Sequence, residues 1–168
     1  THAPADSAMT EEEKAYLADL NTVTFGKSGT VGAEIADPVI LWQGKALDLA
    51  SKVGLNFVFS VKDPAIPAEA LSLHITYTDG EGKPVTEILE GAEVYNESMG
   101  YYVFRYYDLL ASELRRVMQV QIFEGDTPLS CSLTYSADTY GNNKTGPLGD
   151  LCKALFAYSD SAKAFFTE

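Results

Sequence analysis

The chain has 168 residues, of which 46% are hydrophobic and 21% are charged, a composition typical of a globular protein of one domain. Its 24 acidic residues outnumber its 12 basic residues, so the formal net charge is -12. This negative charge repels nucleic acid phosphates and anionic membrane surfaces, so we expect neither as a partner. No apolar run approaches the roughly 20 residues that a membrane-spanning helix requires.

Residues 1–38 are expected to form an extension that precedes the domain. Thr10 and Glu13 form a capping box, which predicts a short helix ending near Asn21. This helix is either a linker that packs on its own domain or the tail of a preceding module. Because the chain opens with Thr rather than Met and shows no signal peptide, we expect a processed or excised fragment of a longer protein.

Short strands dominate the region from residue 39 onward. Two apolar runs, 39–42 and 46–49, are separated by Gln43-Gly44-Lys45, which predicts a hairpin. The clearest strand is 53–61, where every second residue is apolar. A single helical turn is predicted from Leu109 to Leu114. Further strands are expected at 71–78, 85–89, 101–107, 118–123 and 129–135.

A helix is predicted at the C-terminal end of the chain, over residues 147–166. Pro147 suits the first helical position, and Asp150 places negative charge in the first turn, where the helix dipole favours it. One apolar stripe recurs at steps of three, four and seven, and its Leu151, Leu155 and Phe166 are expected to pack on a sheet. The stripe comprises Leu148, Leu151, Cys152, Leu155, Ala162 and Phe166.

These elements together predict a mainly β protein. Seven or eight short strands separated by turn residues are typical of an antiparallel β-sandwich, immunoglobulin-like or similar. The domain is expected over residues 39–168, with the C-terminal α-helix packed on the sandwich and the short N-terminal helix outside it.

Motifs for catalysis, cofactors and metals are missing from the sequence. The two histidines are His2, in the extension, and His74, on the polar face of its strand. There is no serine-hydrolase elbow, zinc-protease helix or phosphate-binding loop, and the carboxylates lie mainly in turns. The acidic loop at 138–143 lacks the ligand order of a calcium site. We therefore expect no enzyme, no cofactor and no metal site.

The two cysteines fall on apolar faces. Cys131 lies in the last predicted strand and Cys152 in the closing helix. They either form a disulfide or remain two free thiols that act as small buried hydrophobes. We expect two free, buried thiols.

Aromatic residues are abundant, with 10 Tyr, 8 Phe and 1 Trp. The strand 101–107 carries them on both faces, so it is either a central strand covered on both sides or a strand with one binding face. Burying Arg105 unpaired would be costly, so its face is expected to point outward. The opposite face is expected in the core and comprises Tyr102, Phe104 and Tyr106. The candidate ligand surface comprises Trp42, Tyr101, Arg105 and Tyr107.

Three motifs carry a resemblance to a known family. They are Leu-Asn-Phe at 55–57, Tyr-Tyr-Val-Phe at 101–104, and the closing helix, with Leu-Cys-Lys-Ala-Leu-Phe-Ala-Tyr at 151–158. Together they resemble a β-sandwich module that recurs in large secreted and cell-wall-attached proteins of anaerobic Gram-positive bacteria. The resemblance covers about residues 46–166. It departs at Ser159, where the pattern has Gly, and at Cys152, where it has an aliphatic residue.

The resemblance implies a secreted or cell-surface location and a supporting role without catalytic residues. Two functions stay open at this point. One is a structural or interaction module of a larger surface protein, and the alternative is a carbohydrate-binding module, so the partner is another protein or a glycan. Tyrosine suits both kinds of surface.

Overall fold

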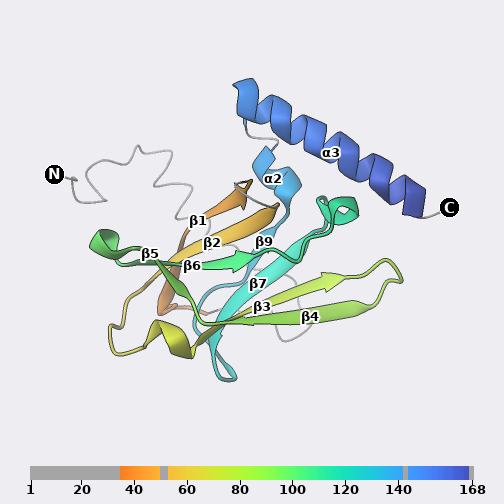
Figure 1. Ribbon diagram of the computed structural model, residues 1–168. Helices are drawn as coiled ribbons and strands as arrows, with labels where there is room; N and C mark the ends of the chain where they lie inside the picture. Colours follow the sequence, from red (N-terminus) through yellow and green to blue (C-terminus); the bar gives the residue numbers. More distant parts are fainter. Residues whose placement is uncertain (1–34, 50–52, 142–143, 167–168) are drawn as a thin grey trace.

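Two antiparallel β-sheets pack against each other as a sandwich, and a long helix follows them at the C-terminal end of the chain (Figure 1). This computed structural model describes residues 35–49, 53–141 and 144–166. The mainly β architecture with a C-terminal helix is as predicted from the alternating strands. The predicted extension, with its helix near Thr10, lies outside the described residues apart from its last few positions.

The first sheet has four strands in the order β1-β2-β6-β5. Its β1 shows that the predicted hairpin at 39–49 is wrong, because the two apolar runs form one strand. A register shift between Trp42 and Gly44 leaves Gln43 as the extra residue of a bulge, and pairing with β2 continues on both sides of it. The strands are β1 (Ile40–Asp48), β2 (Gly54–Val61), β5 (Glu93–Asn96) and β6 (Tyr101–Tyr106).

The second sheet has five strands, with β4, β3, β7 and β8 in order and β9 also paired with β7. The predicted hairpin of β3 and β4 is confirmed, and Leu73 and Ile75 of β3 point into the core. The strands β6 and β7 follow each other in the chain yet belong to different sheets. The five are β3 (Leu71–Thr78), β4 (Pro84–Glu90), β7 (Met118–Glu124), β8 (Thr127–Pro128) and β9 (Leu133–Tyr135).

The segment between β8 and β9 joins the two sheets. Periodicity predicts one strand over 129–135, with Ser130 and Ser132 on the face opposite to Leu129 and Cys131. That prediction is wrong because only Leu133–Tyr135 forms a strand there, and residues on both faces of the preceding segment are buried. The Ile40 amide of β1 donates to the Leu129 carbonyl at 3.0 Å, and the Ile122 amide of β7 donates to Ser130 Oγ at 2.9 Å. Polar groups of Leu129 and Ser130 therefore bond to both sheets, as a buried irregular segment requires, whereas Ser132 Oγ is buried without a hydrogen-bond partner.

Aromatic rings fill the space between the sheets. The Trp42 ring meets Phe57 and Phe59 edge-on at 6.4 and 6.5 Å between centroids, and Phe59 stacks on Phe104 at 5.4 Å. Such offset and edge-on pairs add to the apolar burial that stabilises a core. The two cysteines are free and buried, as predicted.

The helix α3 (Gly146–Phe166) covers one end of the sandwich, and most of its contacts are with the 3₁₀ turn η4 (Ala111–Glu113) and the short helix α2 (Ala137–Gly141) (Figure 1). The prediction that Leu151, Leu155 and Phe166 pack on a sheet is wrong, because α3 meets mainly η4 and α2. Leu151 and Phe166 are 47% and 77% exposed, and only Leu155 of the three is partly buried against the core. The residues that α3 buries lie one position over, at Gly149, Cys152, Phe156 and Ser159. A Cβ at Gly141 would overlap the Phe156 ring, so α2 and α3 approach closely because this position is glycine.

Candidate functional site

Trp42, the first of the predicted ligand residues, belongs to the core. Its side chain is fully buried, and its indole Nε1 donates a hydrogen bond to the Cys131 carbonyl at 2.8 Å. A residue in this position does not meet a ligand on the surface, so the expectation for Trp42 is corrected. The sequence places Trp42 next to a predicted turn, whereas in the structure β1 runs on through that position with Trp42 on its inner face.

The other three predicted residues lie on the outer face of the four-stranded sheet. On the opposite face, which was assigned to the core, Phe104 and Tyr106 are buried and Tyr102 is partly buried against the core. Arg105 Nε donates to Glu93 Oε2 at 3.1 Å, and its guanidinium lies 3.9 Å from Asp48 Oδ2. The Arg105 side chain therefore links β6 to both β5 and β1.

Tyr107 belongs to the same network of ion pairs and hydrogen bonds. Its hydroxyl donates to Asp48 Oδ2 at 2.8 Å, and this hydrogen bond raises the pKa of Tyr107 above its ordinary value. A Cβ at Gly54 would overlap the Tyr107 ring, so the ring rests on a position that only glycine leaves open. Tyr101 is half-buried. These side chains tie strands together and do not form a flat, open platform of rings.

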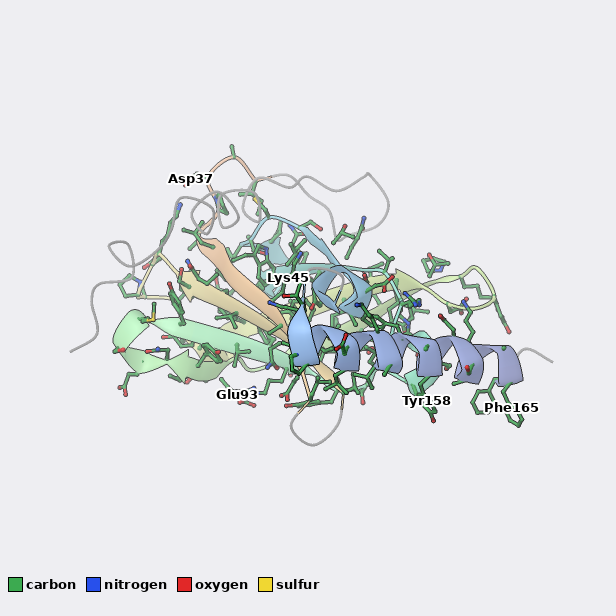
Figure 2. The ribbon with its side chains drawn as sticks, turned by 90° about the horizontal axis from the view of Figure 1, so that it is seen from above. Asp37, Lys45, Glu93, Tyr158 and Phe165 are labelled. Carbon is green, nitrogen blue, oxygen red and sulfur yellow. The ribbon has the colours of Figure 1, made fainter. Side chains whose placement is uncertain are left out.

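Large exposed hydrophobic residues gather instead on α3. Leu148 is 40% exposed, Leu151 47%, Tyr158 62% and Phe165 77%. Together with the partly buried Leu155 and Ala162, they form a series with steps of three and four residues. Residues spaced in this way share one side of a helix. We call these six residues the outer stripe. Figure 2 shows Tyr158 and Phe165 on the same side of α3, pointing away from the sheets.

Arg115, which follows η4, holds α3 in this orientation. Its guanidinium donates to both carboxylate oxygens of Asp160 on α3, at 2.8 and 3.1 Å, and pairs with Asp138 on α2. The hydrogen bond from Arg115 lowers the pKa of Asp160 below its ordinary value. The same guanidinium lies 5.1 Å from the centre of the Phe156 ring. The helix is thus anchored by its buried face, and the outer stripe stays in solvent.

A groove of about 980 Å³ lies between the C-terminal half of α3, η4 and the end of the β3–β4 hairpin. Arg116 in its wall pairs with Glu113 and covers the Tyr77 ring at 3.8 Å. The second carboxylate oxygen of Glu113 is buried without a hydrogen-bond partner. Polar and aromatic side chains of the lining include Thr76, Thr78, Thr86, Ser112, Gln119 and Phe166.

The contacts of His74 indicate a structural role. Its ring stacks on Phe123 at 4.1 Å between centroids and lies 3.2 Å from Ser72 Oγ, and burial lowers its pKa. Among the residues that the structure describes, no three His, Cys, Asp or Glu side chains are grouped to hold a metal. Within the same part of the chain, no helix is long and apolar enough to cross a membrane.

Comparisons with protein families, with curated proteins and with solved structures found no match to this chain. What the chain does is therefore inferred from the geometry of its surface. Sequence reasoning missed the outer stripe as a surface because its periodicity was assigned to packing. A second set of steps of three and four runs through Gly149, Cys152, Phe156 and Ser159, and the structure shows that this set is the buried one.

Proposed function

We propose that this chain is a non-catalytic interaction module of a larger secreted or cell-surface protein, and that the outer stripe of α3 binds its partner. The observation that carries the proposal is a helix anchored by one face while large apolar side chains on another face stay in water. Burying one such side chain fully contributes about 1.5–3 kcal/mol, so covering several of them supports a specific complex. Tyr158 adds a residue type enriched at binding hot spots.

The extracellular location is supported by the three sequence motifs that resemble secreted and cell-wall-attached modules. We also propose that the sandwich is immunoglobulin-like, supported by two packed antiparallel sheets of short strands. Modules of this architecture serve many functions, so the binding role is based on α3 and not on the fold.

Photo-cross-linking at two matched tyrosines tests the proposed surface. Benzoylphenylalanine replaces Tyr158 on the outer stripe in one sample and Tyr95 on β5 in the other, which are 62% and 52% exposed. The module is illuminated alone and with the secreted proteins of its own cells. We expect a discrete protein adduct from position 158 and none from position 95. Equal adducts at both positions, or none at 158, would contradict the proposal.

The groove supports a second function, carbohydrate binding. Its hydroxyl and amide side chains suit sugar hydroxyls, and Phe166, which is 77% exposed, offers a ring at its rim. A glycan array tests this, with the Thr86→Val and Phe166→Ala variants against Leu151→Ala as a control outside the groove. Binding lost only in the two groove variants would support the function, and an array without signal would contradict it.

A further inference from the structure

We infer that the outer stripe binds the outer stripe of a second copy of this chain, with the two α3 helices antiparallel. This inference rests on the proposed function of the outer stripe and names its partner. The interface is isologous, because the same residues serve on both copies around a two-fold axis.

The spacing of the stripe makes it self-complementary. Its steps are three, four, three, four and three residues, an order that reads the same in both directions. A two-fold axis level with the middle of α3, between Phe156 and Ala157, places each member of the stripe opposite another member. The facing pairs are Leu148 with Phe165, Leu151 with Ala162, and Leu155 with Tyr158.

Side-chain sizes favour the antiparallel direction. The aromatic members, Tyr158 and Phe165, both lie in the C-terminal half of α3, and all three leucines lie in the N-terminal half. An antiparallel copy therefore sets each aromatic ring against a leucine. A parallel copy would place Phe165 against Phe165 and leave a gap where Ala162 meets Ala162, which packs less evenly.

The helix dipoles favour the same direction, because they are opposed in the antiparallel pair and aligned in a parallel one. The charged residues of α3 lie on the side of the helix away from the outer stripe, so the contact between the two copies is apolar. They are Asp150, Lys153, Asp160 and Lys163.

The placement of α3 leaves room for a second copy. At about 100° per residue, the buried face and the outer stripe point about 110° apart, so the sandwiches lie beneath the helix pair and not between the helices. The C-terminal half of α3 follows the margin of the molecule, with Tyr158 and Phe165 directed outward (Figure 2). The flank of the stripe away from the body carries two small residues, Ala154 and Ser161, which allow the helices to approach closely.

The expected dimer is weak and strengthened by salt. A helix of 21 residues is about 30 Å long, so a helix pair alone falls at the low end of interface sizes. Each copy also carries a net charge of -12, which opposes association. Salt screens this repulsion between the two copies, whereas the apolar contact between the helices does not depend on screening. Association should therefore tighten between about 0.05 M and about 0.5 M NaCl.

Sedimentation velocity over a range of protein concentrations tests the dimer. The Tyr158→Glu variant places a charge in the middle of the stripe, and Tyr95→Glu places the same charge on β5 at similar exposure. We expect the unmodified chain and Tyr95→Glu to shift from monomer to dimer with concentration, and Tyr158→Glu to remain monomeric. Monomers throughout, or a dimer that survives Tyr158→Glu, would overturn the inference.

Disulfide trapping tests the direction of the helices. The native cysteines are both buried, so added surface cysteines are the ones that react first. An equal mixture of the Leu148→Cys and Phe165→Cys variants should trap the mixed dimer faster than either variant traps its own dimer. Faster trapping of the Phe165→Cys dimer with itself would show a parallel pair and overturn the antiparallel arrangement.

Cross-linking from position 158 separates failure of this inference from failure of the proposed function. An adduct between two copies supports both. An adduct with a different protein, in a chain that sediments as a monomer, supports the interaction module and overturns self-association. A chain that sediments as a monomer and gives no adduct overturns both.

Discussion

Phe156 and Leu151 show how one helix presents two apolar faces with opposite roles. Phe156 is 4% exposed and is enclosed by Gly141 and Arg115, whereas Leu151 is 47% exposed. Periodicity in the sequence identifies both as apolar helix residues. It does not show which of them meets the body, because the two stripes differ by a single position.

Replacing Phe156 with Ala should therefore destabilise the protein, whereas replacing Leu151 should not. Phe156→Ala leaves a cavity beside Cys152 and should lower the free energy of unfolding by about 3–5 kcal/mol. Leu151→Ala removes a side chain from water and should change it by no more than about 0.5 kcal/mol in the monomer. Denaturant unfolding of dilute protein measures both. A larger loss for Leu151→Ala would reverse the assignment of the two faces.

His74 should make stability depend on pH in one direction. Burial lowers its pKa in the folded chain, although the charge of Asp126 opposes this. The unfolded chain therefore binds the proton first as the pH falls. The contribution of the neutral ring is fully present above the unfolded pKa of about 6.5 and is lost as the pH falls through that value toward the folded pKa.

Comparing unmodified protein with His74→Gln isolates this contribution. The stability difference between the two proteins should shrink between about pH 7.5 and about pH 5.5, because only the unmodified chain takes up this proton. Urea unfolding at both pH values provides the measurement. A difference that grows as the pH falls would mean that the folded pKa of His74 is raised.

At the scale of elements, the orientation of α3 depends on its clamp at Arg115. This guanidinium connects η4 to both α2 and α3 and also covers the Phe156 ring. The ion pair between Lys153 and Asp150, at 3.8 Å, lies within α3 and connects it to nothing else. Removing the Arg115 guanidinium should loosen α3 on the sandwich, whereas removing the Lys153 ammonium should not.

Hydrogen exchange tests this difference. Arg115→Met should speed amide exchange along α3 several-fold while the strands keep their protection, because opening of the helix becomes easier without unfolding the sandwich. Lys153→Met is the control and should leave exchange unchanged. Uniform acceleration over all strands in Arg115→Met would instead show that the clamp supports the whole fold.

Strands that alternate cleanly are predictable, and irregular ones are not. Residues 53–61 and 71–78 alternate in sequence, and their patterns match β2 and β3. In β3 the alternation follows the burial of one face, whereas in β2 Val58 on the other face is buried as well. The strand β5 was missed since Val94 and Tyr95 are both exposed, which leaves no alternation to detect. The segment around Ser130 was misread because it bridges the two sheets through hydrogen bonds to β1 and β7 and does not continue as one strand.

At the scale of the whole molecule, strand pairing follows contacts that local patterns do not encode. The chain passes from β4 in one sheet to β5 in the other at Gly91, whose φ of 72° suits glycine. Pairing of β6 with β2 depends on side chains far apart in sequence, such as Phe104 facing Phe57. The class of fold could thus be predicted, whereas the division of strands between sheets could not.

The same limit applies to the candidate site. Arg105 and Tyr107 were placed on one face of the predicted strand 101–107, yet their roles depend on Asp48 and Glu93 from other strands. The outer stripe can be recognised in the sequence as a periodic pattern. Its exposure is a property of the assembled molecule, because it depends on how Arg115 and Phe156 orient α3.

The melting temperature as a function of protein concentration is the most direct measurement of whether the outer stripe binds a second copy. Association of the folded state raises the melting temperature with concentration. Over a range of about a hundred-fold in protein concentration, we predict that the melting temperature rises steadily for the unmodified chain and does not rise for Tyr158→Glu. The two proteins should have the same melting temperature at the lowest concentration, because Tyr158 contributes nothing to the core. Concentration-independent melting of the unmodified chain, or a Tyr158→Glu variant that melts lower even when dilute, would contradict this interpretation.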